Sequence, residues 1–251
     1  MLHIPTADLQ AKAYAENSIT LSAQRVAALI AGIISVLLFA HVLIQFLRFV
    51  MGNDRLYGLA YLFSFGAEHN VPTLYSSLTL LLCALLLAVI GFARHPALQG
   101  SRTYWLALAA IFVFLALDES LQIHEKLIEP MRNLVNATGA LYYAWVIPYS
   151  IGVLLIAAAY VPFLTRLPRR TALLFVLAGT VFVSGAVGFE MLSGIFYVEG
   201  LSLNPAYVVA QTIEELFEMA GIGIFIFALA DYIGSHLGGL SIAIPRNGAR
   251  A

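Results

Sequence analysis

The sequence predicts an all-α, polytopic membrane protein: a bundle of six transmembrane helices with both termini in the cytoplasm. Of its 251 residues, 61% are hydrophobic and only 11% are charged, whereas a soluble domain carries about a quarter charged residues. The apolar residues fall in long runs that end at charges, proline or glycine, as membrane-spanning helices do. Lysine and arginine are shared unequally between the two sets of connecting segments, and this bias indicates the orientation.

Short polar breaks separate the six runs. The first run follows Arg25, and the polar segment before it lacks a basic start, so we expect an uncleaved helix. Pro72 opens the second run and Pro205 the sixth, in keeping with the preference of proline for the first turn of a helix. The breaks HPALQGSR and RLPRR precede the third and fifth runs, and the fourth begins with LYYAWV. These signals predict a single transmembrane domain over 1–251, with spans at about 26–49, 72–93, 103–127, 141–164, 171–193 and 206–232.

The positive charges set the orientation. With six spans, both termini and the loops at 94–102 and 166–170 share one side, which carries nine lysine and arginine residues against four on the other. Positive residues concentrate in the cytoplasm, so we expect cytoplasmic termini in a multi-pass protein of the bacterial inner (plasma) membrane. The chain has no basic tract, and nucleic acid is therefore not an expected partner. Its single cysteine, Cys83, excludes an intramolecular disulfide and a cysteine-based metal cluster.

Two carboxylates fall inside the expected third span, in the stretch FLALDESLQIHEKL. Fifteen residues separate Arg102 from Asp118, about 22 Å of helix, whereas a hydrocarbon core is roughly 30 Å thick. Asp118 and Glu119 must therefore enter the outer part of the membrane. A charged residue at the centre of a membrane helix costs roughly 2.5–3.5 kcal/mol on insertion scales, so carboxylates at such depth indicate function.

Ionisable residues of five spans converge on the same outer side. At 100° per residue, Asp118, Gln122, Glu125 and Glu129 form one stripe of the third span, and the acidic residues of the sixth span form another. Carboxylates that face one another need protons or a cation, and a mixture of carboxylate and imidazole ligands suits Zn, Mn or Fe. We expect a divalent metal held by residues among Asp118, Glu119, Glu190, Glu215, Glu218, His69 and His124, with Glu68, Gln122, Glu125, Glu214 and His41 as further candidates.

Each candidate also has a structural interpretation. Glu214 and Glu215 lie in the first turns of a helix, where the helix dipole favours carboxylates. Asp118 and Glu119 can form a buried salt bridge or a protonated pair. His41 fits a hydrogen-bonded core histidine, and His69 and Glu125 fit solvated surface positions. The aromatic residues at the start of the fourth span are expected to form an interfacial belt, and the alternative is that some of them line the acidic site and hydrogen-bond to it. They are Tyr142, Tyr143, Trp145 and Tyr149.

Two segments carry a family resemblance. GAEHNVPTLYSS and LALDESLQIHEKL resemble segments of uncharacterised bacterial multi-pass membrane proteins with an Asp-Glu…His-Glu element. The resemblance covers most of the chain and implies no function.

Three classes of function follow from the acidic cluster. The first is a membrane-embedded, metal-dependent enzyme acting on a lipid-like or small substrate. The second is a cation- or proton-coupled transporter, and the third is an accessory subunit of a larger membrane complex. Transporters place the site near the midplane and show internal repeats, whereas this site is off-centre and the sequence shows no repeat. The sequence favours the first class without naming catalytic residues. The expected partners are the lipid bilayer and, as open alternatives, a second copy of the chain or a membrane complex.

Overall fold

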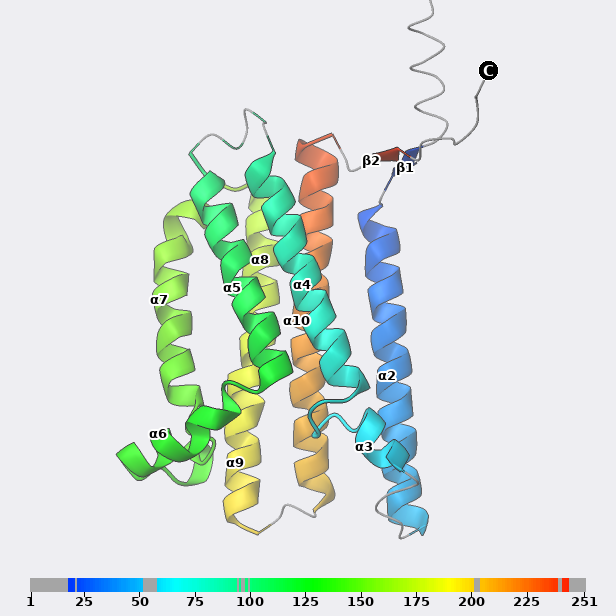
Figure 1. Cartoon of the computed structure of the whole chain (residues 1–251), viewed down its shortest axis with the longest axis vertical. Helices are drawn as coiled ribbons and strands as arrows, with labels where there is room; N and C mark the ends of the chain where they lie inside the picture. The colour runs from blue at the N-terminus through cyan, green and yellow to red at the C-terminus, as the bar shows by residue number, and fades with distance from the viewer. Residues whose placement is uncertain are drawn as a thin grey trace, which may run out of the picture.

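The computed structural model describes residues 18–20, 22–51, 58–93, 95, 98, 100–200, 204–238 and 241–243. Within these residues, six helical segments are long and apolar enough to cross a membrane (Figure 1). They are Ala23–Val50, Val71–Phe92, Arg102–Leu121, Val146–Leu164, Arg169–Val198 and Pro205–His236. The chain is thus helical with six candidate spans, as the sequence predicts. Some residues of the charge count lie outside the described residues: Lys12, Arg55, Arg94, Arg246 and Arg250.

Several shorter elements accompany the spans. The α-helices of the described residues are α2 (Ala23–Met51), α3 (Leu59–Phe63), α4 (Val71–Phe92), α5 (Arg102–Leu121), α6 (Ile128–Val135), α7 (Val146–Leu164), α8 (Arg169–Val183), α9 (Glu190–Val198) and α10 (Pro205–His236). Two 3₁₀ turns, η3 (Glu125–Leu127) and η4 (Gly139–Leu141), and a π-helix, η5 (Ser184–Phe189), complete the helical elements of the same residues.

Helix α10 is the centre of the bundle and packs against α2, α4, α8 and α9 (Figure 1). The main apolar core contains Leu87 of α4, Trp105 of α5, Phe163 of α7 and Leu229 of α10, all buried. Trp105, Phe163 and Leu229 lie near the ends of their helices that are closest to the C-terminus of α10. The apolar core therefore fills that half of the bundle, and the polar residues discussed below occupy the other half.

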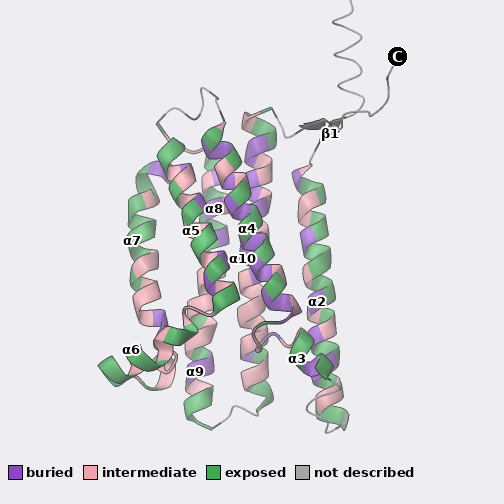
Figure 2. Cartoon of the chain, in the orientation of Figure 1, coloured by how far each residue is buried: buried purple, intermediate pink, exposed green. Residues whose placement is uncertain are grey.

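The outward faces of the spans are apolar. Leu154 and Leu155 of α7 are 69% and 66% exposed, and Val36 and Phe39 of α2 are each 68% exposed (Figure 2). Large aliphatic and aromatic side chains exposed along whole helices are those of a surface that meets lipid.

A short strand pair lies outside the bundle. Strand β1 (Ser18–Thr20) runs antiparallel to β2 (Ser241–Ala243), with Ser18 opposite Ala243. The pairing brings the two ends of the described chain to the same end of the bundle (Figure 1). An even number of spans requires this arrangement.

The third span ends earlier than the sequence suggests. Gln122 has a φ of 52° and lies in the left-handed region, and its N–H donates to the carbonyl of Asp118. This cap ends α5 at Leu121, so the expectation that the span reaches residue 127 was wrong. Gln122, Glu125 and Glu129 therefore do not continue a stripe of the α5 surface.

The fourth span begins at Val146 rather than at 141, because residues 139–141 form a 3₁₀ turn. The fifth extends to Val198, since η5 joins α8 to α9 without a break.

Candidate functional site

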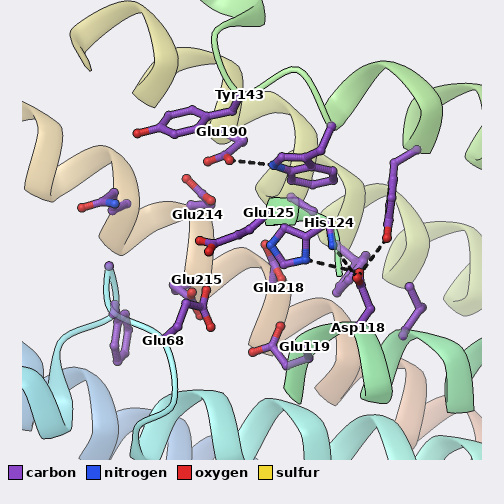
Figure 3. A pocket seen from close by; sticks show the side chains of 18 of the residues that line it. Glu68, Asp118, Glu119, His124, Glu125, Tyr143, Glu190, Glu214, Glu215 and Glu218 are labelled. Atoms are coloured by element: carbon purple, nitrogen blue, oxygen red, sulfur yellow. Dashed lines mark hydrogen bonds and ion pairs between the residues drawn. The ribbon is translucent and has the colours of Figure 1, made fainter. Parts of the chain in front are cut away.

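A cavity of about 260 Å³ lies at the end of the bundle opposite β1 and β2 (Figure 3). Its walls come from the loop before α4, the end of α5 and the turn after it, the start of α7, the η5–α9 junction and the first half of α10. One imidazole, that of His124, lines the cavity, and no lysine or arginine is among the described lining residues. Eight carboxyl groups line it: Glu68, Asp118, Glu119, Glu125, Glu190, Glu214, Glu215 and Glu218.

The left-handed turn at Gln122 directs His124 back onto α5. The backbone N–H of His124 donates to Oδ1 of Asp118 at 2.8 Å, and Nδ1 of its ring lies 3.3 Å from Oδ2 of the same carboxylate. Oη of Tyr149 donates to Oδ1 of Asp118 at 2.9 Å. The buried Asp118 thus accepts from three donors, which fix its position.

The contact with Asp118 determines which ring nitrogen of His124 is available. With Nδ1 as the donor to the carboxylate, Nε2 is deprotonated in the neutral ring and free to bind a cation. The ring of Trp145 packs against the imidazole at 4.8 Å between centroids and limits its rotation. Burial lowers the pKa of His124, but the hydrogen bond and negative charge of Asp118 outweigh this effect, so the pKa lies above its ordinary value.

Within the described residues, three side chains approach closely enough to share a metal ion. Glu68, His124 and Glu125 each offer one ligand atom, and these atoms lie within 4.8 Å of one another. In Figure 3 the side chain of Glu68, from the loop before α4, and those of His124 and Glu125, from the turn after α5, point toward a common space. Two carboxylates and one imidazole form a ligand set found in zinc and other transition-metal sites. Burial raises the pKa of Glu68, and the charge of Glu125 adds to that effect.

Asn70 holds the loop that carries Glu68. Its Nδ2 donates to the carbonyls of Tyr61, Ser64 and Ala67 at 3.2, 2.6 and 2.7 Å, and its Oδ1 accepts from the N–H of Thr73 at 3.1 Å. One side chain therefore caps α4 and closes the loop before it. Oγ1 of Thr73 also lies 3.3 Å from Oε2 of Glu68.

A second group of carboxyls lies on α9 and α10. Nε1 of Trp145 donates to Oε1 of Glu190 at 2.8 Å, and Oγ of Ser193 donates to Oε2 of Glu214 at 3.3 Å. The carboxyl groups of Glu190 and Glu214 also interact with each other. A proton on one of two neighbouring carboxyl groups lets them hydrogen bond to each other.

The π-helix η5 brings this group close to α10. A Cβ added at Gly185 would lie 2.6 Å from the carbonyl oxygen of Glu214 and 3.1 Å from Cγ of Glu218. Only a glycine allows the two helices to approach this closely. Single π-helical turns inside α-helices occur frequently at functional sites.

The structure brings most of the expected residues together. Six of the seven expected metal ligands line the cavity, and so do three of the five further candidates, Glu68, Glu125 and Glu214. Their roles as ligands stay predictions. Glu68 and Glu125, expected only as further candidates, belong with His124 to the group that fits a metal, whereas Asp118 contacts His124 instead.

Three candidates do not line the cavity: His69, Gln122 and His41. His69 is exposed, with a φ of 55°, and Gln122 supplies the turn that ends α5. Nδ1 of His41 accepts from the N–H of Phe65 at 3.1 Å, and Nε2 lies 2.9 Å from Oγ1 of Thr212. Both ring nitrogens of His41 therefore have hydrogen-bond partners. This agrees with the structural interpretation of His41 as a hydrogen-bonded core histidine.

For the aromatic residues around the start of α7, the sequence predicts an interfacial belt and leaves open that some line the acidic site. Trp145 and Tyr149 line the cavity and bond to Glu190 and Asp118, respectively, as in the alternative. Oη of Tyr143 lies 3.0 Å from Oη of Tyr207, so Tyr143 also belongs to the cavity wall. The signal available in the sequence was their proximity to the acidic residues at the same side of the membrane.

The fold and the cavity define a class: a polytopic helical membrane protein with a carboxylate- and histidine-lined cavity at one end of its bundle. The chain belongs to the family described as Domain of unknown function (DUF8692), whose model matches residues 28–232. That range contains all the residues that line the cavity. Comparisons with curated proteins and with solved structures found no match. Family membership therefore agrees with the resemblance to uncharacterised membrane proteins and assigns no function.

Proposed function

We propose that this protein binds a divalent transition-metal ion through Glu68, His124 and Glu125, as the centre of a membrane-embedded, metal-dependent enzyme. The observation that carries the proposal is the orientation of His124. Its Nδ1 contacts Asp118, while its ring shares a space with the carboxylates of Glu68 and Glu125. A metal-binding histidine commonly donates its other ring N–H to a carboxylate, which fixes the ring and strengthens the ligand.

The shape and charge of the cavity support this function. Three protein ligands leave a coordination position open, as in catalytic zinc sites, and the cavity has room for water or a small group beside them. A bound divalent ion lowers the pKa of coordinated water and so supplies a nucleophile. The chain contributes Asp118, which orients His124, and the carboxyl groups of Glu190 and Glu214 at the cavity wall, which can take up and release a proton. Zn, Mn and Fe suit these ligands, and the substrate is lipid-like or small.

The cavity lies on the outer side of the membrane in this proposal. Among the described residues, the end of the bundle near β1 and β2 carries Arg25, Arg102, Arg166, Arg169 and Arg170, and the cavity end carries Arg48, Lys126 and Arg132. This bias favours cytoplasmic termini and an inner-membrane location. Reporter fusions after residue 100 and after residue 200 should read cytoplasmic and periplasmic, respectively. The reverse pattern would place the cavity in the cytoplasm.

Elemental analysis tests the metal directly. Protein purified without chelator should contain Zn, Mn or Fe in stoichiometric amount, and Glu125→Gln should lose most of it. Glu129→Gln is the matched control, because Glu129 is exposed on α6 and does not line the cavity. Wild-type protein that contains no metal, and whose thermal stability ignores added Zn, Mn and Fe, would overturn the proposal.

A proton-coupled transporter is the second candidate, and the neighbouring carboxyl groups of Glu190 and Glu214 in the cavity wall favour it. Intramembrane carboxyls that exchange protons are the coupling groups of many transporters. A metal-free protein whose stability rises as the pH falls, in both wild type and His124→Gln, would support this function over the metal centre.

A further inference from the structure

Helix α6 follows the turn that carries His124 and Glu125, and it is strongly amphipathic. At 100° per residue, Ile128, Met131 and Val135 lie on one side, with Leu134 beside them. Glu129 and Asn133 lie on the opposite side. A short helix with one apolar and one polar side is stable only when something covers the apolar side.

The described part of the bundle covers this side only in part, since Ile128 and Met131 are half-buried. Helix α6 packs chiefly against η3, the turn directly before it. Leu134 is 74% exposed and Val135 is 47% exposed. In Figure 1, α6 projects sideways from the bundle, across the direction of the spans.

The position of α6 along the bundle identifies its partner. It lies between the end of α5 at Leu121 and the start of α7 at Val146, which is the level where two spans leave the hydrocarbon. The apolar surface next to it continues the lipid-facing belt, with Leu121 52% and Ile151 56% exposed. Cations and aromatic rings that typify the membrane–water boundary lie around it: the guanidinium of Arg132 is 4.4 Å from the ring centroid of Tyr142.

We infer that α6 is an interfacial helix whose apolar side, Ile128, Met131, Leu134 and Val135, inserts into the bilayer at its polar–apolar boundary. The occupant of this surface is lipid, because the surface is continuous with the lipid-facing belt and its polar side carries charge. Two residues separate Glu125 from Ile128, so insertion of α6 also anchors the turn that carries His124 and Glu125. This last consequence rests on the proposed metal function.

Spin labels measure the depth of α6 without any metal. The single cysteine, Cys83, is buried and is replaced by alanine. Nitroxide labels are then attached to Leu134→Cys, Asn133→Cys and, as a mid-span reference, Leu154→Cys, in vesicles of phosphatidylcholine and phosphatidylglycerol. Oxygen concentrates in hydrocarbon and a nickel chelate stays in water, so the ratio of their collision rates reports depth.

We expect the ratio of oxygen to nickel collision rates at position 134 to be several-fold higher than at position 133. It should be lower than at position 154. Equal, water-like ratios at 133 and 134 would overturn it. A label at 134 that is immobilised and reached by neither reagent would overturn it as well, because protein would then cover the surface. A separate arm compares the metal content of Leu134→Asp and Asn133→Asp in vesicles. Loss of metal only in Leu134→Asp supports the anchoring of the turn, and equal retention contradicts that consequence alone.

Discussion

Oδ2 of Asp118 lies 3.3 Å from Nδ1 of His124, although the two residues are separated by the end of a membrane helix. Because Oδ1 also accepts the backbone N–H of His124 at 2.8 Å, one carboxylate fixes both the turn and the ring. The position of an acidic residue near the end of a candidate membrane span is thus explained by the imidazole that it contacts.

Asp118→Asn should weaken metal binding while the six spans remain. The amide cannot accept from the imidazole as strongly and removes the charge that holds the ring, and loss of such a partner typically costs about 10–100-fold in metal affinity. Tyr149→Phe removes one donor to the same charged carboxylate and should cost about 1.5–3 kcal/mol of stability, with a smaller change in metal affinity. Competition with a fluorescent chelator measures both. Equal affinities of Asp118→Asn and wild type would contradict the orienting role.

The pH dependence should differ in sign with and without metal. In the metal-free protein the pKa of His124 is raised above 6.5, so its contribution to stability is complete below the unfolded value and is lost as the pH rises through the folded value. Metal binding needs the deprotonated ring of His124. The affinity for the metal should therefore rise with pH over the range between the unfolded and folded pKa values of His124.

The prediction is checked by melting temperatures measured across this pH range, once with chelator and once with added metal. The difference between wild type and His124→Gln with chelator should shrink as the pH rises. His69→Gln is the control, since His69 is exposed and outside the cavity. A pH-independent difference for His124→Gln would refute the assignment.

Asn70→Ala should destabilise the protein by about 2 kcal/mol or more, because it removes a helix cap and leaves three loop carbonyls without their donor. Asn204→Ala is a matched control. Asn204 caps α10 through one bond at 2.9 Å to the N–H of Ala206 and is exposed, so its loss should cost about 1 kcal/mol or less. Unfolding in detergent with chelator measures the free energy without any contribution from metal. Equal losses for the two variants would show that Asn70 acts only as a cap.

The class of the fold and the end of the bundle that holds the carboxylates were predictable from the sequence. Apolar runs of membrane length specify spans, and the short distance from Arg102 to Asp118 forces the latter into the membrane. The turn at Gln122 was not predictable in the same way. No glycine or proline marks it, and a glutamine in the left-handed region gives no local signal.

The partners within the site were also beyond the sequence. Trp145 and Glu190 are 45 positions apart and meet only because the segment between η4 and α7 packs against α9. Tryptophan and tyrosine occur both in interfacial belts and in the walls of polar cavities. The sequence alone therefore does not distinguish the two positions. The same limit applies to His41, whose two partners come from the loop before α4 and from α10.

The close packing of η5 on α10 gives a final prediction. Gly185→Ala places a methyl group 2.6 Å from the carbonyl oxygen of Glu214 and 3.0 Å from Cβ of Phe217, and the backbone must move to accept it. Overpacking of this kind costs about 1–3 kcal/mol. Gly188→Ala lies in the same π-helix, and its Cβ would meet nothing within 4 Å. That variant should match the wild type or gain up to about 1 kcal/mol, because alanine loses less chain entropy than glycine. Thermal unfolding of the two variants in one detergent decides between them: a lower melting temperature only for Gly185→Ala supports the close contact beside Glu214 and Glu218, and equal melting temperatures would contradict it.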